Sequence, residues 1–142
     1  DSYPEDRNFW WTMVIEEKNH AAILRAGEGS YLQVNLFPEE MLASSLKDLK
    51  KVNNNLKKLI EDFSNNPLTR EQAFNLAYKL ELSAGEIHFQ NYMDGNSNSE
   101  MDRIFKRLNQ DDKDHAERIK NYMMEHEIDI NEDILPEFFT KA

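Results

Sequence analysis

The sequence lacks cysteine and has few of the residues that interrupt helices. Its 142 residues include no Cys, 4 Gly and 4 Pro. The absence of Cys excludes disulfide bonds, thiolate metal ligands and cysteine nucleophiles. So few Gly and Pro argue against an all-β fold, whose turns need these residues, and are typical of a helical protein.

Basic residues are also scarce relative to acidic ones. The chain has 17 Lys and Arg against 27 Asp and Glu, which gives a formal net charge of -10. We therefore expect no nucleic-acid partner, because nucleic acid is bound by a basic surface. No apolar run approaches the ~20 residues that span a bilayer, so we expect no membrane partner either. The chain begins at Asp1 without Met, which fits a processed form. We predict one domain over residues 1–142, located in the cytoplasm.

Apolar residues recur at helical spacing in most of the chain. We predict helices over about residues 9–26, 38–63, 70–93 and 98–127. Thr69 with Gln72 has the pattern of a capping box at the start of the third helix, and Ser97 begins a similar pattern at the fourth. Four amphipathic helices of ~18–28 residues predict an all-α, antiparallel four-helix bundle. The apolar tail that begins at Ile128 is expected to pack on this bundle or on a partner.

One six-residue pattern occurs twice, in the first and the last predicted helix. It reads EEKNHA at residues 16–21 and DDKDHA at residues 111–116. Residues i and i+3 share one face of a helix, so Glu17 lies beside His20 and Asp112 beside His115. Helix bundles hold metal ions with a carboxylate and an imidazole at this spacing.

A third acidic residue, Glu81, lies on the flank of the apolar stripe in the helix predicted at 70–93. Helices of similar length that pack side by side bring their midpoints to one height. We therefore predict one central layer, formed by Glu17, His20, Glu81, Asp112 and His115. Buried carboxylates repel one another, and a divalent cation relieves this repulsion. This donor set suits Fe, Mn or Zn. The alternative is a metal-free network in which protonated His20 and His115 pair with the acids.

Parts of both halves resemble ferritin-like bundles of the rubrerythrin type. AYKLELSAGEIHF at 77–89 and DKDHAERIKNYM at 112–123 are similar to two helices of that family, one with a single Glu and one with Glu-x-x-His followed by Ala. FWWTMVIEEKNHAAIL at 9–24 is similar to a histidine-bearing helix of the same family. The resemblance implies a di-iron or di-manganese site and oxidase or peroxidase chemistry on dioxygen or peroxide. It matches Glu81 to a bridging Glu.

The helix predicted at 38–63 departs from the family pattern. Where the family places a second single Glu, its core face carries Leu49, Val52, Asn53 and Leu56. We therefore expect one tightly held ion, with a second held weakly at most. The absent acid also favours a second hypothesis, in which a metal-free bundle serves as a structural or protein-binding module.

Two surface features predict partners. The helix at 38–63 has a basic face, which we interpret as a solvated surface or as a site for an acidic protein partner. It consists of Lys47, Lys50, Lys51, Lys57 and Lys58. The adjacent Trp10 and Trp11 cannot both face one core. Together with the apolar tail they leave apolar surface that a monomer covers poorly, so we predict a homodimer.

Overall fold

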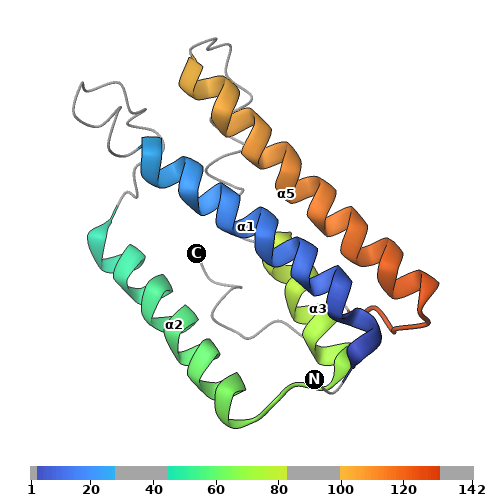
Figure 1. Cartoon of the computed structure of the whole chain (residues 1–142). Coiled ribbons are helices and arrows are strands. Elements are labelled where there is room, and N and C mark those ends of the chain that lie inside the picture. The colour runs from blue at the N-terminus through green and yellow to red at the C-terminus, as the bar shows by residue number, and fades with distance from the viewer. Residues whose placement is uncertain (1–2, 28–44, 83–99, 132–142) are drawn as a thin grey trace.

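The computed structural model describes residues 3–27, 45–82 and 100–131 (Figure 1). All contacts given below are between these residues. They form the short 3-10 helix η1 (Pro4–Asp6) and the helices α1 (Arg7–Gly27), α2 (Leu46–Asn65), α3 (Arg70–Glu81) and α5 (Glu100–Glu125). Helices make up 86% of the described residues, and no strand occurs among them. The all-α fold class is therefore confirmed.

The observed helix limits agree with the predicted ones in part. The capping box at Thr69 is confirmed: the Gln72 N–H donates to Thr69 Oγ1 at 3.2 Å, and the Thr69 N–H donates to Gln72 Oε1 at 3.0 Å. The second helix was predicted to begin at residue 38, whereas α2 begins at Leu46. Ser45, the residue before it, is not helical. The predicted helical residues 38–44, 83–93 and 98–99, the second capping box and the tail from 132 onward lie outside the described residues.

Helices α1 and α3 run antiparallel to α5. Near the start of α1, Phe9 packs on Phe74 of α3 and on Tyr122 of α5, with ring centroids 5.4 and 4.3 Å apart. Further along, Glu17 of α1 and Glu81 of α3 both approach His115 of α5. Residue numbers thus rise along α1 and α3 as they fall along α5, which is the direction seen in Figure 1.

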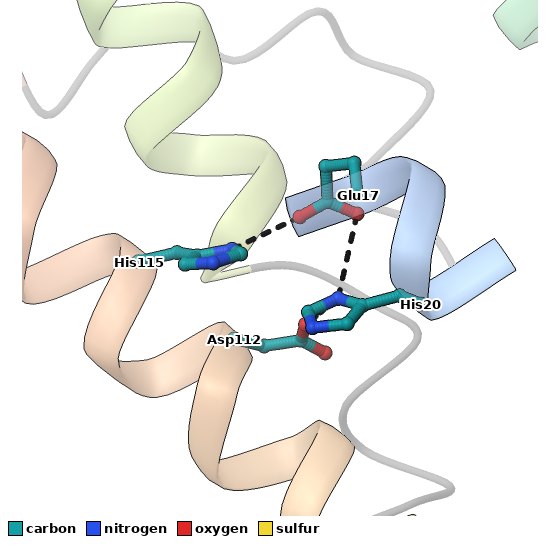
Figure 2. Close-up of side chains that lie close together, drawn as sticks. All are labelled: Glu17, His20, Asp112 and His115. Carbon is teal, nitrogen blue, oxygen red and sulfur yellow. Dashed lines mark ion pairs between the residues drawn. The ribbon is translucent and has the colours of Figure 1, made fainter. Parts of the chain in front are cut away.

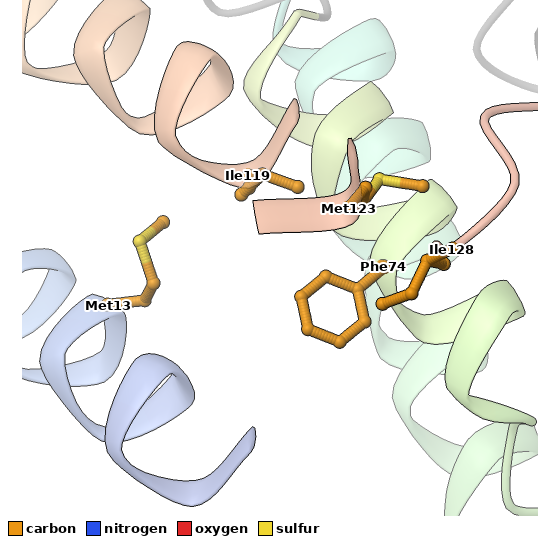
Figure 3. Packing of buried hydrophobic residues seen from close by; sticks show 5 residues of the cluster. All are labelled: Met13, Phe74, Ile119, Met123 and Ile128. Atoms are coloured by element: carbon orange, nitrogen blue, oxygen red, sulfur yellow. The ribbon is translucent and has the colours of Figure 1, made fainter. Parts of the chain in front are cut away.

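These three helices enclose the apolar core. Its buried residues are Met13 of α1, Phe74 of α3, Ile119 and Met123 of α5, and Ile128 just beyond α5 (Figure 3). Ile119 and Met123 are fully buried, and burying a side chain of this size contributes about 1.5–3 kcal/mol. Trp10 packs against the cluster, whereas Trp11 is 62% exposed. The two tryptophans therefore face different surroundings, as predicted.

Helix α5 ends in a hydrogen-bonded C-cap that returns the chain to this core. The Ile128 N–H donates to the Met123 carbonyl at 2.8 Å, and the Glu127 N–H donates to the Met124 carbonyl at 3.4 Å. This is the Schellman pattern, which requires a left-handed residue and is usually made by Gly. Here Glu127 takes that conformation, with φ 54°. The turn buries Ile128 against the end of its own helix.

A buried carboxylate joins η1 to α3 and α5. Asp6 is 1% exposed and accepts hydrogen bonds from Arg70 Nε and Nη2 at 2.8 and 2.7 Å and from the Tyr122 hydroxyl at 2.9 Å. The bidentate bond from Arg70 holds the pKa of Asp6 below its usual value, against the opposing effect of burial. Burial and the bond to Asp6 raise the pKa of Tyr122.

Helix α2 takes little part in this packing. None of its described side chains is buried, and Leu46, Leu49, Val52 and Ile60 are 44–66% exposed. Its lysine face is also exposed, as predicted. The antiparallel arrangement is thus observed for α1, α3 and α5. The position of α2 in a four-helix bundle stays a prediction. Within the described ranges, no helix has the length and apolar character that crossing a membrane requires.

Candidate metal centre

The two copies of the repeated pattern meet where α1 and α5 lie side by side. Glu17 and His20 of α1 converge with Asp112 and His115 of α5 (Figure 2). Each of the four offers one possible ligand atom, and these atoms all lie within 4.8 Å of one another. The structure therefore brings together four of the predicted ligands from segments far apart in the chain.

The local fold explains why these polar groups face inward. Glu17 follows the buried Met13 by one helical turn, and His115 precedes the buried Ile119 by one turn. Residues i and i+4 lie on the same face of a helix, so the polar groups continue the two core-facing stripes. The site is thus the polar extension of the apolar core rather than a separate surface feature.

His115 is the most deeply buried member, at 2% exposed. Its Nε2 lies 3.1 Å from Glu16 Oε2, and Arg118 Nη1 donates to the same oxygen at 2.6 Å. Its Nδ1 lies 2.9 Å from Glu17 Oε1 and 3.7 Å from Glu81 Oε2. Neither of these contacts makes a hydrogen bond, so the buried Nδ1 has no hydrogen-bond partner among the described residues. A buried polar atom in this state calls for a proton or a cation.

His20 lies beside His115, with the ring planes 17° apart and the centroids separated by 5.3 Å. Its Nε2 is 3.5 Å from Asp111 Oδ2, and its Nδ1 is 3.6 Å from Asp112 Oδ1 and 3.7 Å from Glu17 Oε2. All three separations exceed the ~2.7–3.2 Å of a hydrogen bond. Figure 2 shows Glu17 between the two imidazoles, with an ion pair to each.

Each histidine is therefore faced by both acids of the other copy of the pattern. Glu16 and Glu17 face His115, and Asp111 and Asp112 face His20. Sequence reasoning missed the first acid of each copy. The signal was present, because Glu16 and Asp111 precede the histidine of their own copy by four residues and so share its helix face.

Glu81, the fifth predicted ligand, approaches from α3. Its carboxylate lies at the edge of the cluster, 3.7 Å from His115, with 16% of the side chain exposed. Glu81 thus brings a carboxylate from a third helix to the edge of the cluster. No α2 side chain in the described part of the chain belongs to the cluster.

The cluster is rich in negative charge. Five carboxylates surround two imidazoles: Glu16, Glu17, Glu81, Asp111 and Asp112. Burial raises the pKa of Asp112, and the nearby Glu17 carboxylate raises it further, while His20 and His115 act in the opposite direction. The raised pKa means that Asp112 holds a proton more readily than a solvated Asp side chain does.

The residues present fit a transition-metal ion. Opposite ligands of an ion with ~2.1 Å bonds are ~4.2 Å apart. The widest separation here is 4.8 Å, so only a small inward movement of the side chains is needed. Two imidazoles with carboxylates suit Fe, Mn or Zn. Metal-binding His usually gives its second nitrogen to a carboxylate, which is the place of Glu16 beside His115.

The chain was compared with models of protein families, with curated proteins and with solved structures, and none of the three comparisons found a match.

Proposed function

We propose that this protein is a ferritin-like metal-binding protein. The centre between α1 and α5 holds a transition-metal ion, for which iron is our first choice. The protein acts as an oxidoreductase on peroxide or dioxygen. The observation that supports this most is the buried Nδ1 of His115. It has no hydrogen-bond partner among the described residues, and it faces Glu17 at 2.9 Å. A cation between these atoms would satisfy both.

Five side chains would bind the ion. His115 and His20 would supply nitrogen to the ion, and Glu17, which contacts both histidines, would supply a carboxylate oxygen. Asp112 and Glu81 supply oxygen from α5 and α3. A bound iron or manganese ion would supply the electron transfer, which no side chain of this set can do alone.

Two further groups position the ligands. Glu16 faces Nε2 of His115, which leaves Nδ1 directed at the cluster. Arg118 holds Glu16 in place through a 2.6 Å hydrogen bond. This pair would fix the tautomer and the ring orientation of His115, as outer-shell carboxylates do in metal sites.

The competing proposal is a metal-free bundle that serves as a structural or protein-binding module. It is favoured by α2, which brings no described acid to the cluster and exposes an apolar stripe beside its lysine face. In that case protonated His20 and His115 pair with the acids around them. Removal of metal would then leave the stability unchanged.

Elemental analysis of protein purified without added metal tests the proposal. We expect Fe, Mn or Zn at about one equivalent, since the four atoms within 4.8 Å describe one site. His115→Ala should abolish binding. His126→Ala is the matched control, because His126 lies just beyond the same helix and stacks on Tyr122 instead. Protein that contains no metal, takes up none of the three ions and melts identically with and without chelator would refute the metal centre.

A further inference from the structure

A groove runs along α1 beside the metal centre. Its volume is about 710 Å³, within the ~300–1,000 Å³ usual for small-molecule sites. Helix α3 contributes Ala77 and Glu81, and α1 contributes Glu17. Glu17 and Glu81 also belong to the metal cluster. The groove therefore opens onto the candidate metal centre.

The rest of the lining forms one stripe of α1. It consists of Trp10, Met13, Val14, Lys18, Ala21 and Arg25. At 1.5 Å per residue this stripe is ~22 Å long. Its first part is apolar and its last part is basic, with the metal-centre carboxylates between them. The groove is therefore suited to a long ligand with unlike ends.

The basic end has two cations with room between them. Lys18 and Arg25 are exposed, and neither forms an ion pair with another described residue. They are two turns apart on one face, ~10 Å along the axis, so both long side chains can reach one group between them. Ala21 lies at that point, and its short side chain leaves space. Such a pair of cations attracts an anionic group that lies between them.

The apolar end is built on the core. Met13 is 6% exposed, and Trp10 packs on Phe74 with the ring centroids 4.5 Å apart. Val14 adds an exposed apolar edge at 42%. A hydrocarbon chain laid on these residues would remove apolar surface from water on both sides, which favours binding.

We propose that this groove binds an amphipathic monoanion, a medium-chain carboxylate, with its head group between Lys18 and Arg25 and its hydrocarbon chain on Met13, ending near Trp10. The middle of the chain then passes Glu17 and Glu81. As the substrate class of the centre, this ligand rests on the proposed function. The binding itself needs no metal.

Trp10 can report binding directly. The chain has two tryptophans, and Trp11 lies outside the groove, so Trp11→Phe leaves Trp10 as the single fluorophore. Metal-free Trp11→Phe protein is titrated with decanoate below its micellar concentration, and with decanol as the uncharged comparison. We expect a saturable change in Trp10 emission, with decanoate bound more tightly than decanol. A signal that does not saturate, or equal affinities, would overturn the proposal.

Charge variants in the Trp11→Phe background test the head group. An exposed ion pair changes affinity by about two- to fivefold, so Lys18→Gln or Arg25→Gln should weaken decanoate by that factor and leave decanol unchanged. Lys113→Gln is the matched control, because Lys113 holds the place of Lys18 in the second copy of the pattern and lies outside the groove. If Lys113→Gln weakens decanoate as much as Lys18→Gln, the assigned head-group position is wrong.

A steric variant tests the groove itself. Ala21→Leu should block both ligands, whereas Ala22→Leu, at the exposed neighbouring position, should leave both unaffected. Circular dichroism confirms that each variant is folded. A folded Ala21→Leu protein that binds decanoate like its parent would overturn the proposal.

The titration is repeated on protein loaded with Mn²⁺, which separates the two proposals. Decanoate binding without metal binding would support the groove and refute the metal centre. Metal binding without decanoate binding would refute the groove and leave the metal centre standing.

Discussion

The substitution Asp112→Asn should have opposite effects on the stability and on the metal affinity of this protein. Burial and the Glu17 carboxylate raise the pKa of Asp112, so its charged form is disfavoured in the metal-free fold. Asn has nearly the same shape and carries no charge. It should therefore stabilise the metal-free protein, and it should weaken metal binding because an anionic ligand is lost.

The size of the stability gain follows from the geometry. Possible ligand atoms of Asp112 and Glu17 lie at most 4.8 Å apart. Two like charges at that distance repel by about 0.9 kcal/mol in water and about 3.5 kcal/mol at an effective dielectric constant of about 20. Asp112 is 31% exposed, so the value in water is the better guide. The attraction between Asp112 and His20 opposes this repulsion. The expected gain in unfolding free energy is therefore about 1 kcal/mol, or ~3 °C in melting temperature.

Thermal melts with chelator and with Mn²⁺ measure both effects. Metal at 100 times its Kd stabilises the native state by ~2.7 kcal/mol, so the parent protein should melt well above the variant when Mn²⁺ is present. With chelator the order should reverse. Asp114→Asn is the control: Asp114 is exposed on the same helix, accepts a hydrogen bond from Gln110 and should change stability by less than ~0.5 kcal/mol. A metal-free Asp112→Asn protein that melts below its parent would refute the reasoning.

Three further outcomes can be measured. Glu127→Gly should raise the unfolding free energy by ~1 kcal/mol in urea melts, because Gly adopts the left-handed conformation without steric cost; an unchanged midpoint would contradict this. Asp6→Asn should lower it by several kcal/mol at neutral pH. The pKa of Asp6 is lower in the folded than in the unfolded protein, so ionised Asp6 stabilises the fold fully above the unfolded pKa of about 3.9 and loses this effect as pH falls through the folded pKa. The difference in unfolding free energy between parent and variant should therefore narrow in acid. A difference that stays constant with pH would oppose the assignment. Light scattering at micromolar concentration should give a dimer mass for the parent protein and a monomer mass for Leu49→Glu, which alters the exposed face of α2. A monomeric parent protein would refute the predicted homodimer.

Periodicity and capping residues predicted where helices occur, though not all of their limits, because both act locally. The pattern of apolar residues locates α1 and α5, and the Thr69–Gln72 capping box marks the start of α3. The left-handed Glu127 could not be predicted, since the usual signal for that turn is Gly. The exposure of the α2 side chains was not predictable from the α2 sequence either. An apolar stripe shows that a helix can be covered, but not which surface covers it.

The sequence prediction included the second acid and the histidine of each copy, and it overlooked the first acids although the i to i+4 spacing put them on the same helix face. The i to i+3 spacing selected Glu17 with His20 and Asp112 with His115, and these four do come together. The contact between Glu16 and His115 crosses from α1 to α5. It depends on the relative height of two helices, which no spacing within one helix reveals.

Antiparallel packing explains why the same short pattern serves twice. In each copy the acids precede the histidine by three or four residues, ~5–6 Å along the helix axis. When one copy is reversed against the other, the acids of each come level with the histidine of its partner, which is the arrangement seen on α1 and α5. Parallel packing would instead place acids beside acids, and the repulsion would be uncompensated. The duplicated pattern and the helix direction thus depend on each other, and the result is a cluster in which each imidazole is faced by both acids of the other helix.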